Sequence, residues 1–356
     1  MSIIHRKPKE NIYPSITPKS AKFYLWYFIN DSDLFSCYLH IFLFSQMWNQ
    51  SIFDSPSRME SQTAGEKDNT NDGFAASADT DLGDPSGITT LMVAIAGSKL
   101  GQVRKLIQAD ADIHAANETG NTALILAAKF GRFSCVQMLI DAKADVNVAN
   151  KFGNTAVMMS AHYGKEKSLQ LLLDAKANPT TTNSNGDTAL ATAIFQDKIG
   201  CVQILLNAKA DPNVKTPHNL IPLNIAAAVG NTACLQMLLD AKADIKAKDQ
   251  NDDTALTIAA HMGRSACLQM LIDAKADINA RTQRGHTAVI KTAHQGHTEC
   301  LQVLLAAKAD VDAKDRGGDT AVIVAALEGH TECLQLLLNA KASLDAANND
   351  CGTALI

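Results

Sequence analysis

The sequence of 356 residues lacks the short patterns that mark most enzyme active sites. It contains no glycine-rich phosphate loop, no G-x-S-x-G, no H-E-x-x-H and no C-x-x-C. Each of these patterns places a nucleophile, a general base, a metal ligand or backbone donors where a reaction needs them. We therefore expect that the chain is not an enzyme and that it holds no metal or cofactor.

The chain also lacks an excess of positive charge. Its formal net charge is -5 and its pI is about 6.0. Proteins that bind nucleic acid through the phosphate backbone usually carry a broadly basic surface. Nucleic acid is therefore not an expected partner.

No apolar run is long enough to cross a membrane as a helix, which takes about 20 residues. The best candidates, residues 23–29 and 34–44, are separated by Asn30, Asp31 and Asp33. Joining them would place two aspartates near the bilayer centre, at about 2.5–3.5 kcal/mol each. A membrane partner is therefore not expected, although residues 20–48 could act as an anchor.

Residues 1–58 hold 12 of the 18 aromatic residues of the chain. Three interpretations of this segment stay open: a peripheral anchor or partner segment, an unusual membrane hairpin, or a non-functional leader with translation starting at Met59. We favour the leader. Residues 59–86 carry seven acidic residues against the single lysine Lys67, and we expect an acidic, disordered lead-in because few apolar side chains are present to bury.

From residue 87 onward the sequence repeats every 33 residues without an insertion or deletion. A fixed period of this size indicates a solenoid, in which each unit buries its apolar face against its neighbours. The units begin at Gly87, Gly120, Gly153, Gly186, Asn219, Asp252, Gly285, Gly318 and Cys351.

The second unit shows how each repeat should fold. Thr122 is placed to cap a first helix, and Gly131 is placed to end it in the left-handed conformation. A second helix follows, and residues 145–153 supply a hairpin-like turn to the next unit. The apolar residues at helical spacing, which should face the core, are Leu124, Ala127, Ala128, Val136, Leu139 and Ile140.

These residues resemble the ankyrin repeat, with its T-P-L, G-H and D-V-N motifs. Thr-Ala pairs at 122 and at five further units match the first motif, Gly296-His297 matches the second, and Asp145-Val146-Asn147 matches the third. The resemblance implies an all-α ankyrin-repeat solenoid over residues 87–356, with about eight full repeats and a truncated ninth. One departure is a lysine where the family has glycine, which costs stability if that position is left-handed: Lys143, Lys176, Lys209, Lys242, Lys275, Lys308 and Lys341.

Six of the eight cysteines lie at multiples of 33 residues inside the apolar helical pattern. Equivalent atoms of stacked units should be about 10 Å apart, whereas a disulfide needs Cα atoms within about 7 Å. We expect buried free thiols, which suit a reducing, cytoplasmic location. The pairs His297-x-x-Cys300 and His330-x-x-Cys333 offer only two ligands per unit, so packing is favoured over a metal site.

Two positions vary most between units: the hairpin tip and the end of the first helix. In ankyrin-repeat proteins both line the concave surface that binds a partner, and here they include aromatic and methionine side chains suited to an interface. The alternative is packing between units. The predicted protein-binding residues are Lys129, Phe130, Lys151, Phe152, His162, Tyr163, Phe195, Gln196, Val229, His261, Met262 and His294.

The same resemblance implies a modification. Asparaginyl hydroxylases that act on ankyrin repeats favour a leucine eight residues before the asparagine, with Asp and an apolar residue directly before it. Asn147 and Asn279 fit this pattern. The alternative is that both asparagines serve only to shape the turn.

The sequence therefore predicts a scaffold or adaptor that binds a partner protein on its concave face and hairpin tips. Two alternatives come from other classes: a membrane-tethered receptor component anchored through residues 20–48, and the regulatory arm of an enzyme whose catalytic domain lies beyond Ile356. We also expect the weakest junction between units four and five. There Asp197 replaces a glycine, Ile221 replaces the capping threonine, and three prolines fall between Asp211 and Pro222.

Overall fold

The structure, a computed structural model, describes residues 86–216 and 221–354. The interpretations of residues 1–58, including the anchor at 20–48, and of the lead-in before residue 86 lie outside these ranges. Among the described residues, no helix is both long enough and apolar enough to cross a bilayer.

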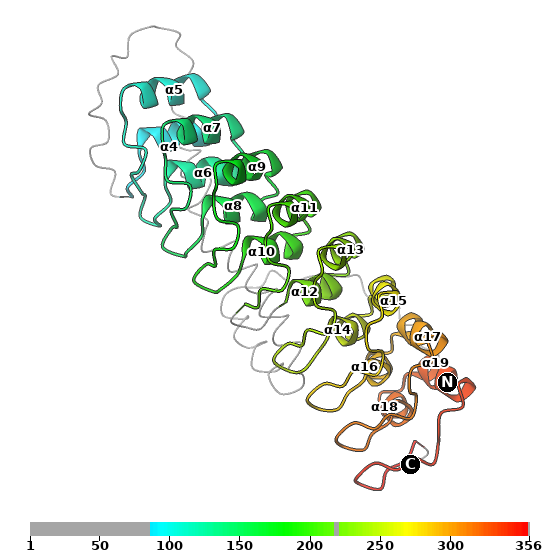
Figure 1. Ribbon diagram of the computed structural model, residues 1–356. Coiled ribbons are helices and arrows are strands. Elements are labelled where there is room, and N and C mark those ends of the chain that lie inside the picture. Colours follow the sequence, from blue (N-terminus) through cyan, green and yellow to red (C-terminus); the bar gives the residue numbers. More distant parts are fainter. Residues whose placement is uncertain (1–85, 217–220, 355–356) are drawn as a thin grey trace, which may run out of the picture. The chain divides into compact units, whose positions relative to one another are not determined.

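The described residues form sixteen short helices in eight consecutive pairs (Figure 1), which confirms the all-α repeat architecture. The first helices of the pairs are α4 (Thr90–Ala96), α6 (Ala123–Phe130), α8 (Ala156–His162), α10 (Ala189–Phe195), α12 (Pro222–Val229), α14 (Ala255–His261), α16 (Ala288–Gln295) and α18 (Ala321–Leu327). The second helices are α5 (Leu100–Gln108), α7 (Phe133–Asp141), α9 (Glu166–Asp174), α11 (Ile199–Asn207), α13 (Thr232–Asp240), α15 (Ser265–Asp273), α17 (Thr298–Ala306) and α19 (Thr331–Asn339).

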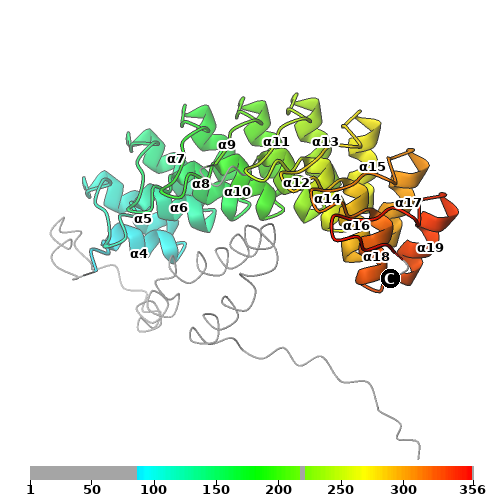
Figure 2. The ribbon, with the colours of Figure 1, turned by 90° about the horizontal axis from the view of Figure 1, so that it is seen from below.

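The pairs stack in chain order, so that each helix packs against its counterpart in the next unit. The array is an arc with the first helices in an inner row and the second helices in an outer row (Figure 2). We call these the inner and outer helices. Hairpin loops connect successive units, and each crosses to the next inner helix.

Capping explains where the inner helices start and stop. The Oγ1 atom of Thr122 accepts a hydrogen bond from the backbone N–H of Ile125 at 3.5 Å, and Gly131 ends the helix at φ 69°. Thr155 and Thr188 cap their helices in the same way. These are the roles that the repeat pattern predicts for threonine and glycine.

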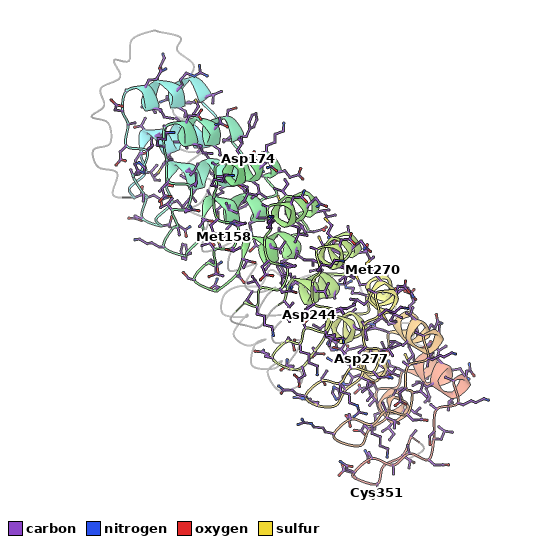
Figure 3. The ribbon with its side chains drawn as sticks, viewed as in Figure 1. Met158, Asp174, Asp244, Met270, Asp277 and Cys351 are labelled. Atoms are coloured by element: carbon purple, nitrogen blue, oxygen red, sulfur yellow. The ribbon has the colours of Figure 1, made fainter. Side chains whose placement is uncertain are left out.

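The core is a double layer of small and branched apolar side chains between neighbouring units. The inner helices bury nearly every residue, including Met158 of α8 (Figure 3), whereas the outer helices bury one stripe. Six cysteines lie in that outer-helix stripe as buried free thiols, which confirms the prediction, and Cys351 is exposed. Burial raises the pKa of the Cys201, Cys234 and Cys300 thiols to about 11, so these are poor nucleophiles.

Hydrogen bonds between successive hairpins add to the packing. The backbone N–H of Lys151 donates to the carbonyl of Thr119 at 3.0 Å, and that of Ser184 donates to Phe152 at 2.9 Å. A side chain also donates to the preceding hairpin: Asn150 Nδ2 donates to Asn121 Oδ1 at 2.8 Å. Within the described parts of the chain, these bonds fix successive hairpins against one another.

The seven lysines at the family's glycine position all adopt left-handed backbone conformations. Their φ values are 69° (Lys143), 68° (Lys176), 63° (Lys209), 66° (Lys242), 68° (Lys275), 62° (Lys308) and 64° (Lys341). A residue with a Cβ atom costs about 1–2 kcal/mol in this region. The sequence predicted a loss of stability if this position is left-handed, and it is left-handed at all seven turns.

The junction between units four and five contains a compensation that the sequence did not reveal. Asp197 is left-handed, at φ 56°, and its carboxylate accepts a hydrogen bond from the Asn231 side chain of the next unit. Asn231 also accepts from the Cys234 N–H at 2.8 Å and so caps α13. Ile221 provides no side-chain cap for α12. The weak junction stays a prediction. One of its proposed defects, Asp197 in place of glycine, is offset by the hydrogen bond between Asp197 and Asn231.

Candidate protein-binding surface

The ends of the inner helices, which hold most of the predicted binding residues, recur once per unit along the inner side of the array (Figure 2). Lys151 and Phe152 lie in a hairpin instead. Lys151, Phe152 and His294 are exposed, and His162 is buried at 6 % exposure. The other eight are partly exposed: Lys129, Phe130, Tyr163, Phe195, Gln196, Val229, His261 and Met262.

Four of these residues form one cluster at the ends of α6 and α8. The Lys129 ammonium lies 5.7 Å from the centroid of the Phe130 ring and 5.9 Å from that of Tyr163. The His162 and Tyr163 rings meet edge to face with centroids 4.6 Å apart. Stacking of units two and three brings these groups together from positions 33 residues apart. The result is a half-exposed aromatic surface with a cation held over it, here called the aromatic cluster (Lys129, Phe130, His162 and Tyr163).

The remaining predicted residues lie along the array and do not converge. Phe195 and Gln196 end α10, Val229 ends α12, and Met262 follows α14, so each unit contributes its own contact. His294 Nε2 lies 3.6 Å from Glu328 Oε1 of the next unit. Such a linear arrangement suits contact with a long or large partner. Among the described residues, no three His, Cys, Asp or Glu side chains are placed to share a metal ion.

Two histidines of this surface are neutral at physiological pH. Burial lowers the pKa of His162 to about 4, and Lys198 and Lys129 add to the effect. Burial also lowers the pKa of His261 to about 3, with Lys291 as the next cause. Neither ring therefore acts as a cation near pH 7.

Acid should destabilise the array through His162. Its pKa is lower in the folded protein than in the unfolded chain, so the unfolded chain binds the proton first as the pH falls below about 6.5. Stability is therefore full at pH 7 and is lost as the pH falls towards 4. For this one group we expect a loss of about 2 kcal/mol between pH 7 and pH 5.

Urea unfolding of the natural protein and of a His162→Gln variant at both pH values measures this effect. The variant should lose about 2 kcal/mol less than the natural protein on acidification. Equal losses in the two proteins would show that His162 does not carry the pH dependence.

A column of cations on the hairpins was not predicted from the sequence. Lys215, Lys248, Arg281 and Lys314 occupy the same position of four consecutive units, and all four side chains are exposed. Lys248 Nζ donates to the Arg281 carbonyl at 3.3 Å, and Arg281 Nη1 donates to the Lys314 carbonyl at 2.9 Å. Comparison of this column between units would have found it, because the first three units have Ala116, Ala149 and Thr182 there.

A buried ion pair was also missed. Lys291 Nζ of α16 lies 2.6 Å from Asp253 Oδ1, and the two side chains are 5 % and 1 % exposed. Burial lowers the pKa of Lys291, and the charge and hydrogen bond of Asp253 oppose that shift. The signal in the sequence is a lysine at a position where the other units have an apolar residue or threonine: Val93, Leu126, Met159, Thr192, Ile225, Ile258 and Val324.

Asn147 and Asn279, the predicted hydroxylation sites, are exposed and hold successive units together. Asn147 Oδ1 accepts from the Asn178 N–H at 2.8 Å, and Asn279 Oδ1 accepts from the Asp310 N–H at 3.0 Å. Asn213 makes the same bond to Asp244 at 2.8 Å. This structural role does not test hydroxylation, which stays a prediction for both residues.

In the pairs His297-x-x-Cys300 and His330-x-x-Cys333, the histidine and the cysteine lie in different surroundings. His297 Nε2 lies 3.0 Å from the carbonyl of His261, at the end of the preceding inner helix, and His330 Nε2 lies 3.1 Å from that of His294. Cys300 and Cys333 are buried in the outer-helix stripe. The two histidines therefore cap helix ends in the neighbouring unit.

Comparison with known proteins agrees with this architecture. The family profile described as "Ankyrin repeats (3 copies)" matches residues 69–150, 142–216, 209–282 and 275–348. The solved ankyrin repeat domain of human ASB11 superposes with a TM-score of 0.58 at 23% sequence identity, covering 63% of this chain and 99% of that domain. At that identity the likeness shows the fold alone. No curated protein sequence matches the chain. Since the profile spans most of the sequence and the eight helix pairs have the expected form, the chain belongs to the ankyrin-repeat family, whose repeats generally mediate protein–protein interactions.

Proposed function

We propose that the chain is a scaffold or adaptor that binds a partner protein along the inner helix ends and hairpin tips. The observation that carries this proposal is the aromatic cluster, where Phe130 and Tyr163 remain partly exposed beside Lys129. Partly exposed aromatic rings next to a cation are typical of the centre of a protein interface. The six buried thiols suit a reducing, cytoplasmic setting.

A binding role is favoured over a catalytic one by the character of the side chains. The buried cysteines have raised pKa values, and His162 and His261 have lowered ones. Burial favours the neutral form of each group, and none is paired as a nucleophile with its base. The described residues thus offer recognition by shape and charge.

Truncation of the inner-surface aromatic residues should weaken binding without unfolding the array. We expect Phe130→Ala, Tyr163→Ala and Phe195→Ala each to cost about 1–3 kcal/mol of affinity, since these rings bury the most area per side chain. A matched control is Phe133→Ala, because Phe133 is 46 % exposed on the outer helix α7. It should leave affinity within about 0.5 kcal/mol of the natural protein.

The measurement is affinity capture with the full chain, followed by calorimetry of the captured partner with each variant. Circular dichroism of the four variants checks the fold. If Phe133→Ala weakens binding and the three inner variants do not, the partner contacts the outer row and the proposed surface is wrong.

A further inference from the structure

We infer that the partner presents an acidic, extended segment to the hairpins of the C-terminal half of the array. The inference rests on the proposed function and names the chemistry of the bound segment. It is carried by the basic strip, which we define as Lys215, Lys248, Arg281 and Lys314.

The strip is held in place before any partner arrives. Each cation from Lys248 onward donates to a backbone carbonyl of the following hairpin, and the last of these bonds joins Lys314 Nζ to the Ala347 carbonyl at 2.9 Å. The side chains therefore lie along the array axis. A lysine has three donors and an arginine has five, so one such bond leaves others for a carboxylate. Preorganised cations lose less side-chain entropy on binding.

Carboxylates in the same turns are engaged within the protein. Asp249 Oδ1 accepts from the N–H groups of Asn251 and Asp253, at 2.8 and 2.9 Å. Asp315 Oδ1 accepts from the Asp319 N–H at 2.9 Å, while its Oδ2 lies 3.3 Å from His286 Nε2. Both aspartates are half-buried. Each turn also holds an exposed aspartate four residues before the cation, and in Asp244, Asp277 and Asp310 its Oδ1 atom accepts the backbone N–H two residues further on.

Further cations lie at the hairpin tips that end units six and seven. Arg284 and Arg316 are both exposed there. The equivalent positions at the ends of units one and two carry Thr119 and Lys151. The surface thus changes along the array from aromatic to basic.

The spacing of the strip favours an extended polypeptide. Stacked units are about 10 Å apart, and an extended segment in the polyproline II conformation rises about 3.1 Å per residue with three residues per turn. Every third side chain of such a segment therefore points the same way and meets a new cation. Single-stranded nucleic acid would need rings on which successive bases stack, whereas the residues on either side of the last three cations are Ala247 and Asp249, Ala280 and Thr282, and Ala313 and Asp315.

The test uses the full chain and a labelled peptide of about 18 residues with the repeating sequence Glu-Ser-Thr, which in the polyproline II conformation places carboxylates on one side about 9 Å apart, close to the spacing of the strip. The triple variant Lys248→Gln/Arg281→Gln/Lys314→Gln should weaken binding about tenfold or more. A matched triple, Lys242→Gln/Lys275→Gln/Lys308→Gln, removes three exposed charges from the outer-helix ends of units five to seven and should change binding less than about twofold. If the first triple variant does not fold, the single variant Arg281→Gln replaces it in the test, and it should weaken binding about threefold.

Three results would overturn the inference: equal weakening by the two triples, equal binding of the glutamine version of the peptide, or tighter binding of a single-stranded oligonucleotide of the same charge. The outcome is separable from that of the proposed function. Suppose that a captured partner no longer binds the Phe130→Ala and Tyr163→Ala variants but still binds the basic-strip triple. That result would refute the acidic segment and would support the proposed scaffold function.

Discussion

Replacing Lys291 by methionine should destabilise the array by about 3–5 kcal/mol, the usual cost of breaking a buried ion pair from one side. The methionine fits a position that holds Met159 in the third unit, so shape is not the cause. The cause is Asp253, whose side chain is 1 % exposed and whose charge loses its partner at 2.6 Å. The Thr257 hydroxyl still donates to Asp253 Oδ1 at 2.7 Å, but a neutral donor compensates only part of a buried charge.

The double variant Asp253→Asn/Lys291→Met should recover most of this loss. It reproduces the pair Asn121 and Met159, which occupy the same two positions of units two and three. Exchanging a buried ion pair for a neutral pair is often neutral or stabilising by about 1–4 kcal/mol. Urea unfolding of both single variants and the double variant measures the coupling. Additive losses in the double variant would mean that the two residues do not interact in solution.

Restoring glycine at the left-handed lysines should raise stability. We expect about 0.5–1 kcal/mol for each site, because glycine relieves the left-handed strain but gains entropy in the unfolded chain. In a linear array the contributions of separate turns add, so all seven replacements together should give several kcal/mol. The first variants to make are Lys143→Gly, Lys176→Gly and Lys275→Gly, whose φ values of 68–69° are among the highest of the seven lysines.

Alanine at the same three sites is the matched control. It removes the same charge as glycine but keeps the Cβ atom that causes the strain. Thermal and urea unfolding should therefore show a gain for the glycine set and none for the alanine set. An equal gain in both sets would trace the effect to charge repulsion between lysines of successive units.

A large part of the fold follows from the sequence because the repeat encodes it locally. The 33-residue period, the capping Thr122 and the helix-ending Gly131 each act within a few residues of their own position. The buried cysteine column and the burial of Leu124, Ala127 and Ala128 follow from helical spacing alone. Even the left-handed lysines were predictable, since the family places glycine there and backbone conformation is a local property.

The candidate surface was predicted only in part. Positions that vary between units pointed to Phe130 and Tyr163, but variation does not distinguish an exposed residue from a buried one such as His162. The basic strip went unnoticed for a related reason. Lysine and arginine are common on every surface, so their recurrence at one repeat position does not by itself mark a site. The bonds that Lys248, Arg281 and Lys314 make from one hairpin to the next distinguish this column.

The sequence by itself determined the repeat, its helices, its caps and its buried stripes, because each depends on residues close together in the chain. Only the tertiary structure decided which side chains of different units meet. Lys291 pairs with Asp253 across 38 residues and Asn231 with Asp197 across 34. Stacking converts a separation of about one repeat into direct contact, and a single sequence carries no signal that selects one such partner from the several side chains within reach.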